Sequence, residues 1–537
     1  MKEYSLSIKD MLIGGLRPDE RVPRNSGFLE ECKNVRVSRF GDISDLSTFT
    51  PIDDPFASGY LTGQSITVGH PFPQIFKGRE ATFLLTQTGM YTVTEGANWT
   101  LSQISTYNAY NVTAAKAITS GNSWQFADFG KMYALFNGNC MVFKHYFDSY
   151  DSGIGEASNV LVVDDVTINT GCAFRGRMIM GGFDPTDFYN TSWQSFFSAN
   201  YPSIEISQPG APGSNFVWWS SIGEGALFLI YAAHETAGIY TDPGESVTVY
   251  STATRNKLYD TINKNQMGFM PMPWQGTVQC VKPMGNGVMV YGDNGITYMP
   301  HIKGTFGVKP ILPYGICSRN SVCGNDPINP TENVFIDEAG WLHRINEEGD
   351  RNLGFREFFE DMVDDGDDVL ISYDPIEQEY HISNDALCYV LTKDDKLYES
   401  GFLPTGIAVY AGGAVGVCDQ AGEDDDEYAV LQSCPIDLGV RGIGIIERVV
   451  VVCTNTDKVE VALGWRMKSG DSWSTTPYKV INNEGAAYFP VRGIEFKIII
   501  RVEDYSTFDP DDVVVHFKTA DKRLIRGTYT LDNLARR

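Results

Sequence analysis

The chain has 537 residues, of which 42% are hydrophobic and 12% aromatic, and it contains 53 glycines. This length exceeds that of one ordinary domain, so we expect two or three domains. The formal net charge of −26 argues against a protein that reads nucleic-acid sequence, because such a protein needs a basic face to neutralise phosphates. The ten cysteines include no Cys-x-x-Cys pair, which disfavours disulfide scaffolds and zinc ribbons and favours reduced, mostly buried thiols.

Residues 1–80 are rich in Pro and Gly and open with a polar arm. They contain a hairpin signal at 34–46 (NVRVSRFGDISDL), where two alternating runs flank Phe40 and Gly41. The N-terminus (MKEYSLSIKDMLIGG) lacks the apolar core of a signal peptide, and no run approaches the length of a membrane span. We therefore expect synthesis and folding in a cytosol, without a membrane segment.

A hairpin signal recurs along residues 81–420. Its clearest copy is 334–345 (VFIDEAGWLHRI), in which two alternating runs flank a turn at 338–340. The other copies, at 83–93, 133–143, 178–182, 217–229, 289–299 and 381–391, are expected to turn at Gly89, Asn137–Gly138, Gly181–Gly182, Gly223, Asp293–Gly295 and Asn384–Asp385. The turns lie about 40–50 residues apart, except for one gap of about 72 residues that we interpret as an extra blade or an insertion.

This period predicts a β-propeller of six to eight blades. One four-stranded sheet has two apolar faces, and stacking sheets around an axis covers both of them. Another all-β arrangement is the alternative if the even spacing is accidental. Helical patterns are nearly absent, and the best helix candidate is the short stretch 354–363 (GFREFFEDMV).

The pattern changes after the propeller region. Residues 401–418 are Gly-rich and apolar, and 421–427 (AGEDDDE) form an acidic loop. Longer strands are expected at 447–454, 459–467, 487–491, 496–502 and 512–518, and together they predict a separate β-sandwich. The predicted organisation is all-β: an N-terminal arm and hairpin partly joining the propeller (1–80), a β-propeller (81–420), a β-sandwich (428–520) and a basic tail (521–537).

Common catalytic constellations are missing. The sequence has no phosphate-binding P-loop, no His-Glu-x-x-His zinc helix and no Gly-x-Ser-x-Gly nucleophile elbow, and its seven histidines are spread singly. The acidic run of Asp361, Asp364, Asp365, Asp367 and Asp368 offers carboxylates for calcium but lacks the spacing of an EF-hand. We expect that run to be a solvated turn, and we predict no catalytic residue, no metal and no cofactor.

One function that suits a propeller is that of a carbohydrate-binding or glycosidase module, such as a host-receptor or polysaccharide module. The candidate carboxylates are Asp184, Asp187, Asp242 and Asp293, and the candidate stacking aromatics are Trp193, Trp218, Trp219, Trp274 and Trp341. The aspartates lie near predicted turns, where Asp is common, and the tryptophans are expected to pack blades. In a strand, Trp218 and Trp219 point to opposite faces.

Two stretches resemble virion proteins of short-tailed bacteriophages. Residues 29–43 (LEECKNVRVSRFGDI) resemble the hairpin near the N-terminus of tail nozzle (tail tubular protein B) and packaged-DNA stabilisation (hub) proteins. Residues 216–223 (FVWWSSIG) are similar to a blade strand of the same family, although Val217-Trp218 stand where the family usually has an Arg-x-Ser-type position. The two stretches cover about 25 residues, whereas a propeller followed by a sandwich would cover the whole chain.

The resemblance implies a structural virion protein. Six copies would form a nozzle or hub ring below the portal and adaptor rings, extend the DNA channel, help to retain the packaged genome and let it pass on ejection. The implied partners are further copies of the chain, portal-adaptor proteins, tail fibre or needle proteins, and double-stranded DNA that passes without sequence-specific binding. The protein would be made in the host cytoplasm and located in the phage tail. Acidic walls suit such a conduit because they repel phosphate.

The two ends of this acidic chain are net basic. Residues 1–41 carry eight Lys/Arg against six Asp/Glu, and residues 518–537 carry six against two. Isolated surface ion pairs contribute only about 0–1 kcal/mol to stability, whereas arginine forks suit protein interfaces. We predict that the ends dock onto an adaptor ring or an adjacent subunit, and solvated termini are the alternative. The predicted docking residues are Arg17, Arg21, Arg24, Arg36, Arg39, Lys522, Arg523, Arg526, Arg536 and Arg537.

Overall fold

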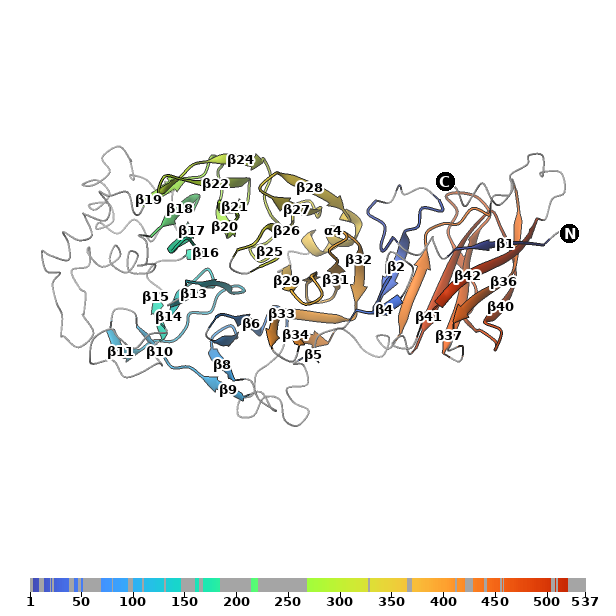
Figure 1. Ribbon diagram of the computed structural model, residues 1–537, viewed down its shortest axis with the longest axis horizontal. Helices are drawn as coiled ribbons and strands as arrows, with labels where there is room; N and C mark the ends of the chain where they lie inside the picture. The colour runs from blue at the N-terminus through green and yellow to red at the C-terminus, as the bar shows by residue number, and fades with distance from the viewer. Residues whose placement is uncertain are drawn as a thin grey trace, which may run out of the picture. The chain divides into compact units, whose positions relative to one another are not determined.

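The computed structural model consists almost entirely of β-sheet and divides into two compact units (Figure 1). The sandwich unit contains Met1–Thr48, Ala386–Leu403 and Gln420–Arg537, and the propeller unit contains Phe49–Asp385 and Pro404–Asp419. The structure describes residues 3–8, 14–19, 21, 24–37, 43–46, 50–51, 69–79, 81–94, 100–108, 111–129, 132–145, 160–163, 168–183, 214–220, 268–326, 329–364, 369–410, 413–420, 428–438, 442–453, 456, 458–503, 508 and 510–519.

The described part of the propeller unit contains seven sheets, and the first three are antiparallel apart from one parallel pairing at the outer edge of the second. The first consists of β6 (Gln74–Lys77), β7 (Thr82–Leu85), β8 (Met90–Thr94) and β9 (Thr100–Gln103). The second consists of β12 (Gln125–Asp128), β13 (Met132–Phe136), β14 (Met141–His145) and β15 (Val160–Val163), with β10 (Thr106–Asn108) and β11 (Asn111–Ala115) beyond β15. The third consists of β16 (Ile168–Phe174), β17 (Arg177–Phe183), β18 (Phe216–Trp219) and β19 (Gly268–Pro271).

The remaining sheets follow in chain order. The fourth consists of β20 (Val278–Met284), β21 (Gly287–Gly292) and β22 (Ile296–Ile302), with β23 (Thr305–Phe306) and β24 (Lys309–Leu312) both on β22. The fifth consists of β25 (Val322–Gly324), β26 (Glu332–Ile336), β27 (Leu342–Asn346) and β28 (Asp350–Gly354), and the helix α4 (Arg356–Asp364) follows it. The sixth begins with β29 (Leu370–Asp374) and β30 (Glu379–Ser383), and the seventh is β33 (Phe402–Tyr410), β34 (Gly413–Gln420) and β5 (Thr50–Pro51).

The core of the propeller unit lies between neighbouring sheets. One buried cluster joins the first and second sheets, including Phe83 and Leu85 on one side and Tyr133 and Leu135 on the other. Further clusters join the third sheet to the fourth and the fourth to the fifth. These five sheets therefore bury apolar faces against neighbouring sheets, which is the packing of a propeller.

The hairpin turns share one local device. The residue directly after the second strand of the sheet caps the turn with a side-chain oxygen: Thr86 Oγ1 accepts the Gly89 N–H at 2.9 Å, and Asn137 Oδ1 accepts the Cys140 N–H at 2.8 Å. Asp337 Oδ1 accepts the N–H groups of Ala339 and Trp341 at 2.9 and 2.8 Å. Thr, Asn and Asp bond nearby backbone in this way, which explains their recurrence at the predicted turns.

The third sheet corrects one predicted turn. The β16–β17 turn lies at Arg175 and Gly176, both with positive φ (47° and 74°), whereas the expected turn residues Gly181 and Gly182 lie inside β17. A Cβ at Gly181 would come within 2.6 Å of Val278 Cγ1 on the fourth sheet. Glycine there permits the next sheet to approach, so it marks close packing rather than a turn.

The long gap in the turn series falls within the third sheet. Strand β17 pairs with β18, and β18 with β19, although residues 184–215 and 220–267 separate these strands in the sequence. The extra length is therefore an insertion into one sheet. The predicted turn near Gly223 lies outside the described residues.

The seventh sheet closes through a strand from much earlier in the chain. Thr50 and Pro51 of β5 pair in parallel with Val415 and Gly416 of β34. The fold class, an all-β propeller with a sandwich-like domain, is thus confirmed, and seven described sheets belong to the propeller unit. The predicted helix at 354–363 is also confirmed as α4, which buries Phe359 and Met362.

The sandwich unit contains two main sheets. One has the order β1 (Glu3–Ser7), β42 (Pro510–Thr519), β36 (Gly444–Cys453) and β40 (Ala486–Gly493). In the other, β31 (Cys388–Leu391), β32 (Leu397–Ser400), β2 (Leu29–Lys33), β35 (Ala429–Ser433), β41 (Glu495–Val502) and β37 (Val459–Arg466) follow one another, with β38 (Ser474–Thr475) and β39 (Lys479–Val480) on β37. All five predicted C-terminal strands are present, and alternate residues such as Val449, Val515, Leu463 and Ile498 are buried, as a sandwich core requires.

The N-terminal segment belongs mainly to the sandwich unit rather than to the propeller. The predicted hairpin at 34–46 is present as β3 (Val35–Val37) paired with β4 (Ile43–Asp45). However, β1 pairs with β42 and β2 pairs with β35, so residues 3–37 complete the sandwich sheets, and the propeller unit begins at Phe49 rather than at residue 81. These pairings join residues more than 390 positions apart, which hydrophobic periodicity does not encode.

Candidate functional site

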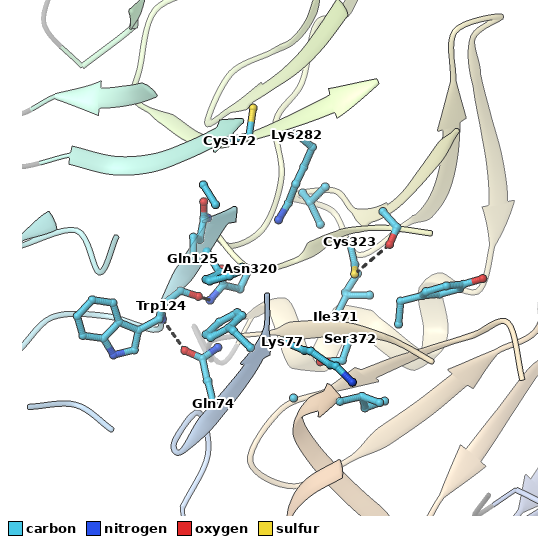
Figure 2. A pocket seen from close by; sticks show the side chains of 18 of the residues that line it. Gln74, Lys77, Trp124, Gln125, Cys172, Lys282, Asn320, Cys323, Ile371 and Ser372 are labelled. Carbon is cyan, nitrogen blue, oxygen red and sulfur yellow. Dashed lines mark hydrogen bonds between the residues drawn. The ribbon is translucent and has the colours of Figure 1, made fainter. Parts of the chain in front are cut away.

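The seven sheets of the propeller unit surround an axial cavity of about 360 Å³ (Figure 2). Each sheet contributes its innermost strand to the lining: β6, β12, β16, β20, β25, β29 and β33. Pockets of this size on a rigid scaffold are the usual places where small ligands bind. The axial cavity is therefore the candidate site.

Side chains tie neighbouring inner strands to one another. Thr170 of β16 donates to Gln125 Oε1 of β12 at 2.5 Å and accepts the Val281 N–H of β20 at 2.9 Å. Thr170 is fully buried, so both partners depend on this single hydroxyl. The lining around the cavity is thus cross-linked by hydrogen bonds between sheets, which fixes its geometry.

Further bonds extend this ring to the first and seventh sheets. The Trp124 N–H donates to Gln74 Oε1 at 2.5 Å, as Figure 2 shows, and Thr405 of β33 donates its hydroxyl to the Pro73 carbonyl. The seventh sheet is therefore linked directly to the first, which completes the closure around the axis.

The segment Ser318–Asn320 crosses one end of the cavity. Its Arg319 carbonyl accepts Gln125 Nε2 of the second sheet at 2.7 Å, and its Asn320 carbonyl accepts the Ile371 N–H of the sixth sheet at 3.0 Å. Gln125 is the first residue of β12 and Ile371 is the second residue of β29, so the segment links the starts of these two inner strands. We call this axial cavity the funnel.

Four charged residues line the funnel: Lys77, Lys282, Asp128 and Asp326. Asp128 accepts the Arg79 N–H at 3.0 Å and lies 3.9 Å from its guanidinium. Asp326 accepts a backbone N–H of its own loop at 2.9 Å. Both carboxylates therefore already have donors within their own parts of the fold.

Three thiols lie close enough to Lys282 to feel its charge, and two of them, Cys172 and Cys323, line the funnel. Burial raises the pKa of Cys323 to about 11 and also raises those of Cys172 and Cys280, although the nearby Lys282 charge lowers each in part. All three cysteines are free and remain protonated at neutral pH. The lysine is thus bordered by neutral groups.

A second polar cluster lies in the fifth sheet around His343, which is fully buried. Its Nδ1 lies 3.0 and 3.1 Å from the carboxylate oxygens of Asp350, and its Nε2 lies 3.3 Å from Asp337 Oδ2. Burial alone lowers the pKa of His343, but the hydrogen bonds and charges of the two carboxylates outweigh it and raise that pKa to about 8. The sequence shows His343 as one of seven single histidines and does not reveal the carboxylate pair, which strand pairing brings together.

The predicted docking arginines that the structure describes are Arg17, Arg21, Arg24 and Arg36. Arg24 contacts the buried carboxylate of Glu495, and Arg17 lies 3.7 Å from Glu30, both inside the sandwich unit. Arg36 lies on β3, whereas Arg21 is exposed. The other six docking residues, Arg39, Lys522, Arg523, Arg526, Arg536 and Arg537, lie outside the described residues.

Four of the remaining candidates are buried or hydrogen-bonded within the fold, whereas Asp361 is exposed on α4. Trp218 and Trp219 are both buried on β18, and Asp293 accepts the Thr277 N–H at 2.8 Å and Gln279 Nε2 at 2.6 Å. Trp274 donates to Thr297 Oγ1 at 2.9 Å. The residues Asp184, Asp187, Asp242, Trp193, Asp365, Asp367 and Asp368 lie outside the described part of the chain.

Among the described residues, no three His, Cys, Asp or Glu side chains gather as a metal site would require. None of their helices combines the length and apolar character needed to cross a membrane.

Comparison with known proteins gives remote likenesses only. No protein-family model matches the chain, and no curated protein matches it significantly. Among solved structures, PorZ, a bacterial surface component of the type-IX secretion system of Porphyromonas gingivalis, is 10% identical with a TM-score of 0.32; the match covers 77% of this chain and 46% of PorZ, less than half of its length. The Neurospora crassa Pan2 WD40 domain is 9% identical with a TM-score of 0.32, over 71% of this chain and 88% of that domain. An extracellular domain assigned to a hybrid two-component system of B. thetaiotaomicron is 10% identical with a TM-score of 0.37, over 89% and 61% of the two chains.

Proposed function

We propose that the chain is a structural virion protein, a subunit of the nozzle or hub ring of a short phage tail. In this role it extends the DNA channel, helps to retain the packaged genome and allows its ejection. The likeness of residues 29–43 and 216–223 to that family motivates the proposal. Six copies around an axis, in contact with adaptor and fibre or needle proteins, follow from the same likeness.

The observation that carries the proposal is the structural role of Asn34, the asparagine at the centre of the first stretch. Asn34 is buried with a φ of 61°, its N–H donates to the Glu399 carbonyl, and its Nδ2 donates to the Tyr428 carbonyl at 3.1 Å. Its Oδ1 accepts the Gly401 N–H at 2.7 Å. The family-like residue therefore joins three separate segments of the sandwich unit, which supports a shared architecture rather than a shared active site.

The second family-like stretch is also part of the core. Phe216–Trp219 form β18, and Ser220 accepts the Met178 N–H through its hydroxyl at 2.9 Å and Arg177 Nη1 through its carbonyl at 3.0 Å. Arg177 is 2% exposed, so the Ser220 carbonyl binds a buried guanidinium directly after β18. Both family-like stretches thus have structural roles in the fold, which supports the proposal of a structural protein.

The carbohydrate alternative has less support from the axial cavity. The two carboxylates that line the cavity already have donors, as described above. Two of its four aromatic lining residues, Phe76 and Phe126, stack on each other with centroids 5.5 Å apart. A sugar-binding aromatic needs an open ring face. Trp341 has the Arg356 guanidinium 6.0 Å from its ring, which favours a packing role.

The charge distribution gives a further argument for a conduit. The formal charge of −26 resists adhesion of DNA phosphates, while basic ends can meet acidic neighbours. Arg17 and Arg24 are engaged within the sandwich unit, and Arg36 is half-buried on β3. Among the described arginines we therefore assign docking to the exposed Arg21. Replacing Arg21 by Glu should weaken attachment to adaptor-bearing heads in low salt.

Labelling of virions tests this function. Antibodies against the purified chain should bind at the tail of intact particles, and particles assembled without it should lose packaged DNA. Activity on a panel of polysaccharides combined with absence from the virion would favour the carbohydrate function instead.

A further inference from the structure

We propose that the axial funnel of the propeller binds a carboxylate group on a short apolar body, with Lys282 as its counter-ion. The source is a small organic acid or an acidic side chain of a peptide, and both present the same group. This inference concerns the propeller unit alone and does not rest on the proposed virion role.

The first step is the missing counter-charge of Lys282. Its side chain is partly buried and extends from β20 into the cavity (Figure 2). Among the described residues, no hydrogen bond or ion pair reaches its ammonium, and the three thiols around it are neutral. A partly desolvated cation without a partner is costly, so an anion that enters the funnel gains a charge-assisted hydrogen bond there.

The second step is a pair of neutral donors in the same cavity. Gln74 uses its Oε1 to accept the Trp124 N–H, so its amide NH2 faces the cavity without another partner among the described residues. The Ser372 hydroxyl on β29 also lines the cavity and has no hydrogen bond within the described part of the chain. A carboxylate accepts up to four hydrogen bonds, so an ammonium, an amide and a hydroxyl from three sheets suit it.

The third step is the apolar wall. Ile75, Val322 and Ile371 line the cavity and are 3%, 3% and 8% exposed. They offer contact to a few methylene groups, each worth about 0.8 kcal/mol when buried. Asp128, Asp326 and a second cation, Lys77, also line the cavity. The four formal charges of the lining cancel, so a single carboxylate fits better than a dianion.

The experiment is a titration of the full chain with matched pairs of probes, followed by NMR or calorimetry. Butyrate should bind saturably and butyramide, which has the same shape without the charge, should bind at least about ten-fold more weakly. N-acetylglutamate amide and N-acetylglutamine amide form the corresponding peptide pair. Binding of butyrate alone identifies a small organic acid as the source of the carboxylate. Binding of N-acetylglutamate amide alone identifies an acidic side chain of a peptide.

Two variants assign the charge to its residue. Lys282→Met keeps the length of the side chain and should weaken binding of the acid by about ten-fold or more. Lys309→Met, on an exposed position of β24 in the same sheet, is the matched control and should bind as the unchanged protein does. If Lys282→Met disturbs folding, Ser372→Ala provides a second variant, expected to weaken binding several-fold.

Three results would overturn the proposal. One is equal binding of each acid and its amide, and another is unchanged affinity of a folded Lys282→Met protein. The third is the absence of saturable binding for both acids to the unchanged protein.

Discussion

At the scale of single residues, buried polar side chains fix the arrangement of this fold. His343 has carboxylates at both ring nitrogens, so both nitrogens must carry protons for its hydrogen bonds to form. The imidazolium is therefore the stable form in the folded state. The adjacent ring of Phe335, stacked at 4.7 Å, holds it in place.

This arrangement makes the stability of the propeller unit depend on pH. The folded-state pKa of His343 is raised from 6.5 to about 8, so the stabilisation is fully present below about pH 6.5 and is lost as the pH rises through about 8. The loss amounts to about 2 kcal/mol in the free energy of unfolding. Urea unfolding at pH 6, 7, 8 and 9 should show this decline, and His343→Gln should be less stable at pH 6 and lack the decline.

An NMR titration of 15N-labelled histidine provides the direct control. A His343 pKa at or below 6.5 in the folded protein would contradict the assignment. So would parallel stability curves for the unchanged protein and His343→Gln between pH 6 and 9.

Asn34 allows a similar test in the sandwich unit. Asn34→Gly keeps the positive φ but removes two side-chain hydrogen bonds, whereas Asn34→Ala removes the bonds and also strains the backbone. Both should lower the free energy of unfolding, Asn34→Ala by about 1 kcal/mol more than Asn34→Gly. Chemical denaturation measures the free energy of unfolding of each variant. Equal stability of the two variants would show that the positive φ of residue 34 does not constrain the choice of residue there.

At the scale of elements, the inner strands act as one ring because side chains bridge them. Thr170→Val keeps the shape of the side chain but removes the hydroxyl that joins β12, β16 and β20. It leaves Gln125 Oε1 and the Val281 N–H without this partner, and should cost about 2–4 kcal/mol. Thr92→Val on β8, which removes one exposed hydrogen bond of 3.3 Å, is the control and should cost less than about 0.5 kcal/mol.

Thermal unfolding and hydrogen exchange measure this difference. Faster exchange of the Val281 amide in Thr170→Val would locate the effect at the ring. Equal stability of the two variants would mean that the bridges contribute nothing to closure.

Local patterns were sufficient to predict these elements. The hairpins at 83–93, 133–143, 289–299 and 334–345 are present, because period-2 alternation and a capped turn both act within a dozen residues. The turn expected at Gly181 was wrong, because glycine at that position lets Val278 of the fourth sheet pack closely against β17. The funnel could not be predicted, since Gln74, Lys282 and Ser372 lie on separate strands and no spacing rule links them.

At the scale of the whole molecule, the sandwich unit is assembled from both ends of the chain. Ile8 is fully buried beside β42 and donates its N–H to the Val513 carbonyl at 2.8 Å. Pairing between such distant residues has no local signature, which is why the N-terminal segment was assigned mainly to a separate arm. The propeller and the sandwich themselves were predictable, because each follows from strand patterns within its own stretch.

A substitution pair tests this assembly. Ile8→Ala should lower the free energy of unfolding of the sandwich unit by about 2–5 kcal/mol, because it opens a cavity under β42. Val452→Ala on β36, where the side chain is 42% exposed, should cost less than about 1 kcal/mol. Hydrogen exchange of the β36 and β42 amides measures the effect of Ile8→Ala and of Val452→Ala on the sheet. An equal effect of both substitutions would contradict the burial of the N-terminal segment.

The role that we propose, a ring-forming subunit of a phage tail, requires this propeller-and-sandwich chain to assemble with itself. Negative-stain electron microscopy of the purified full chain, at increasing protein concentration and with classification of the particle images, tests it most directly. The account predicts closed rings with an axial hole and six-fold symmetry. Single particles at every concentration, both alone and in the presence of adaptor-bearing heads, would contradict it.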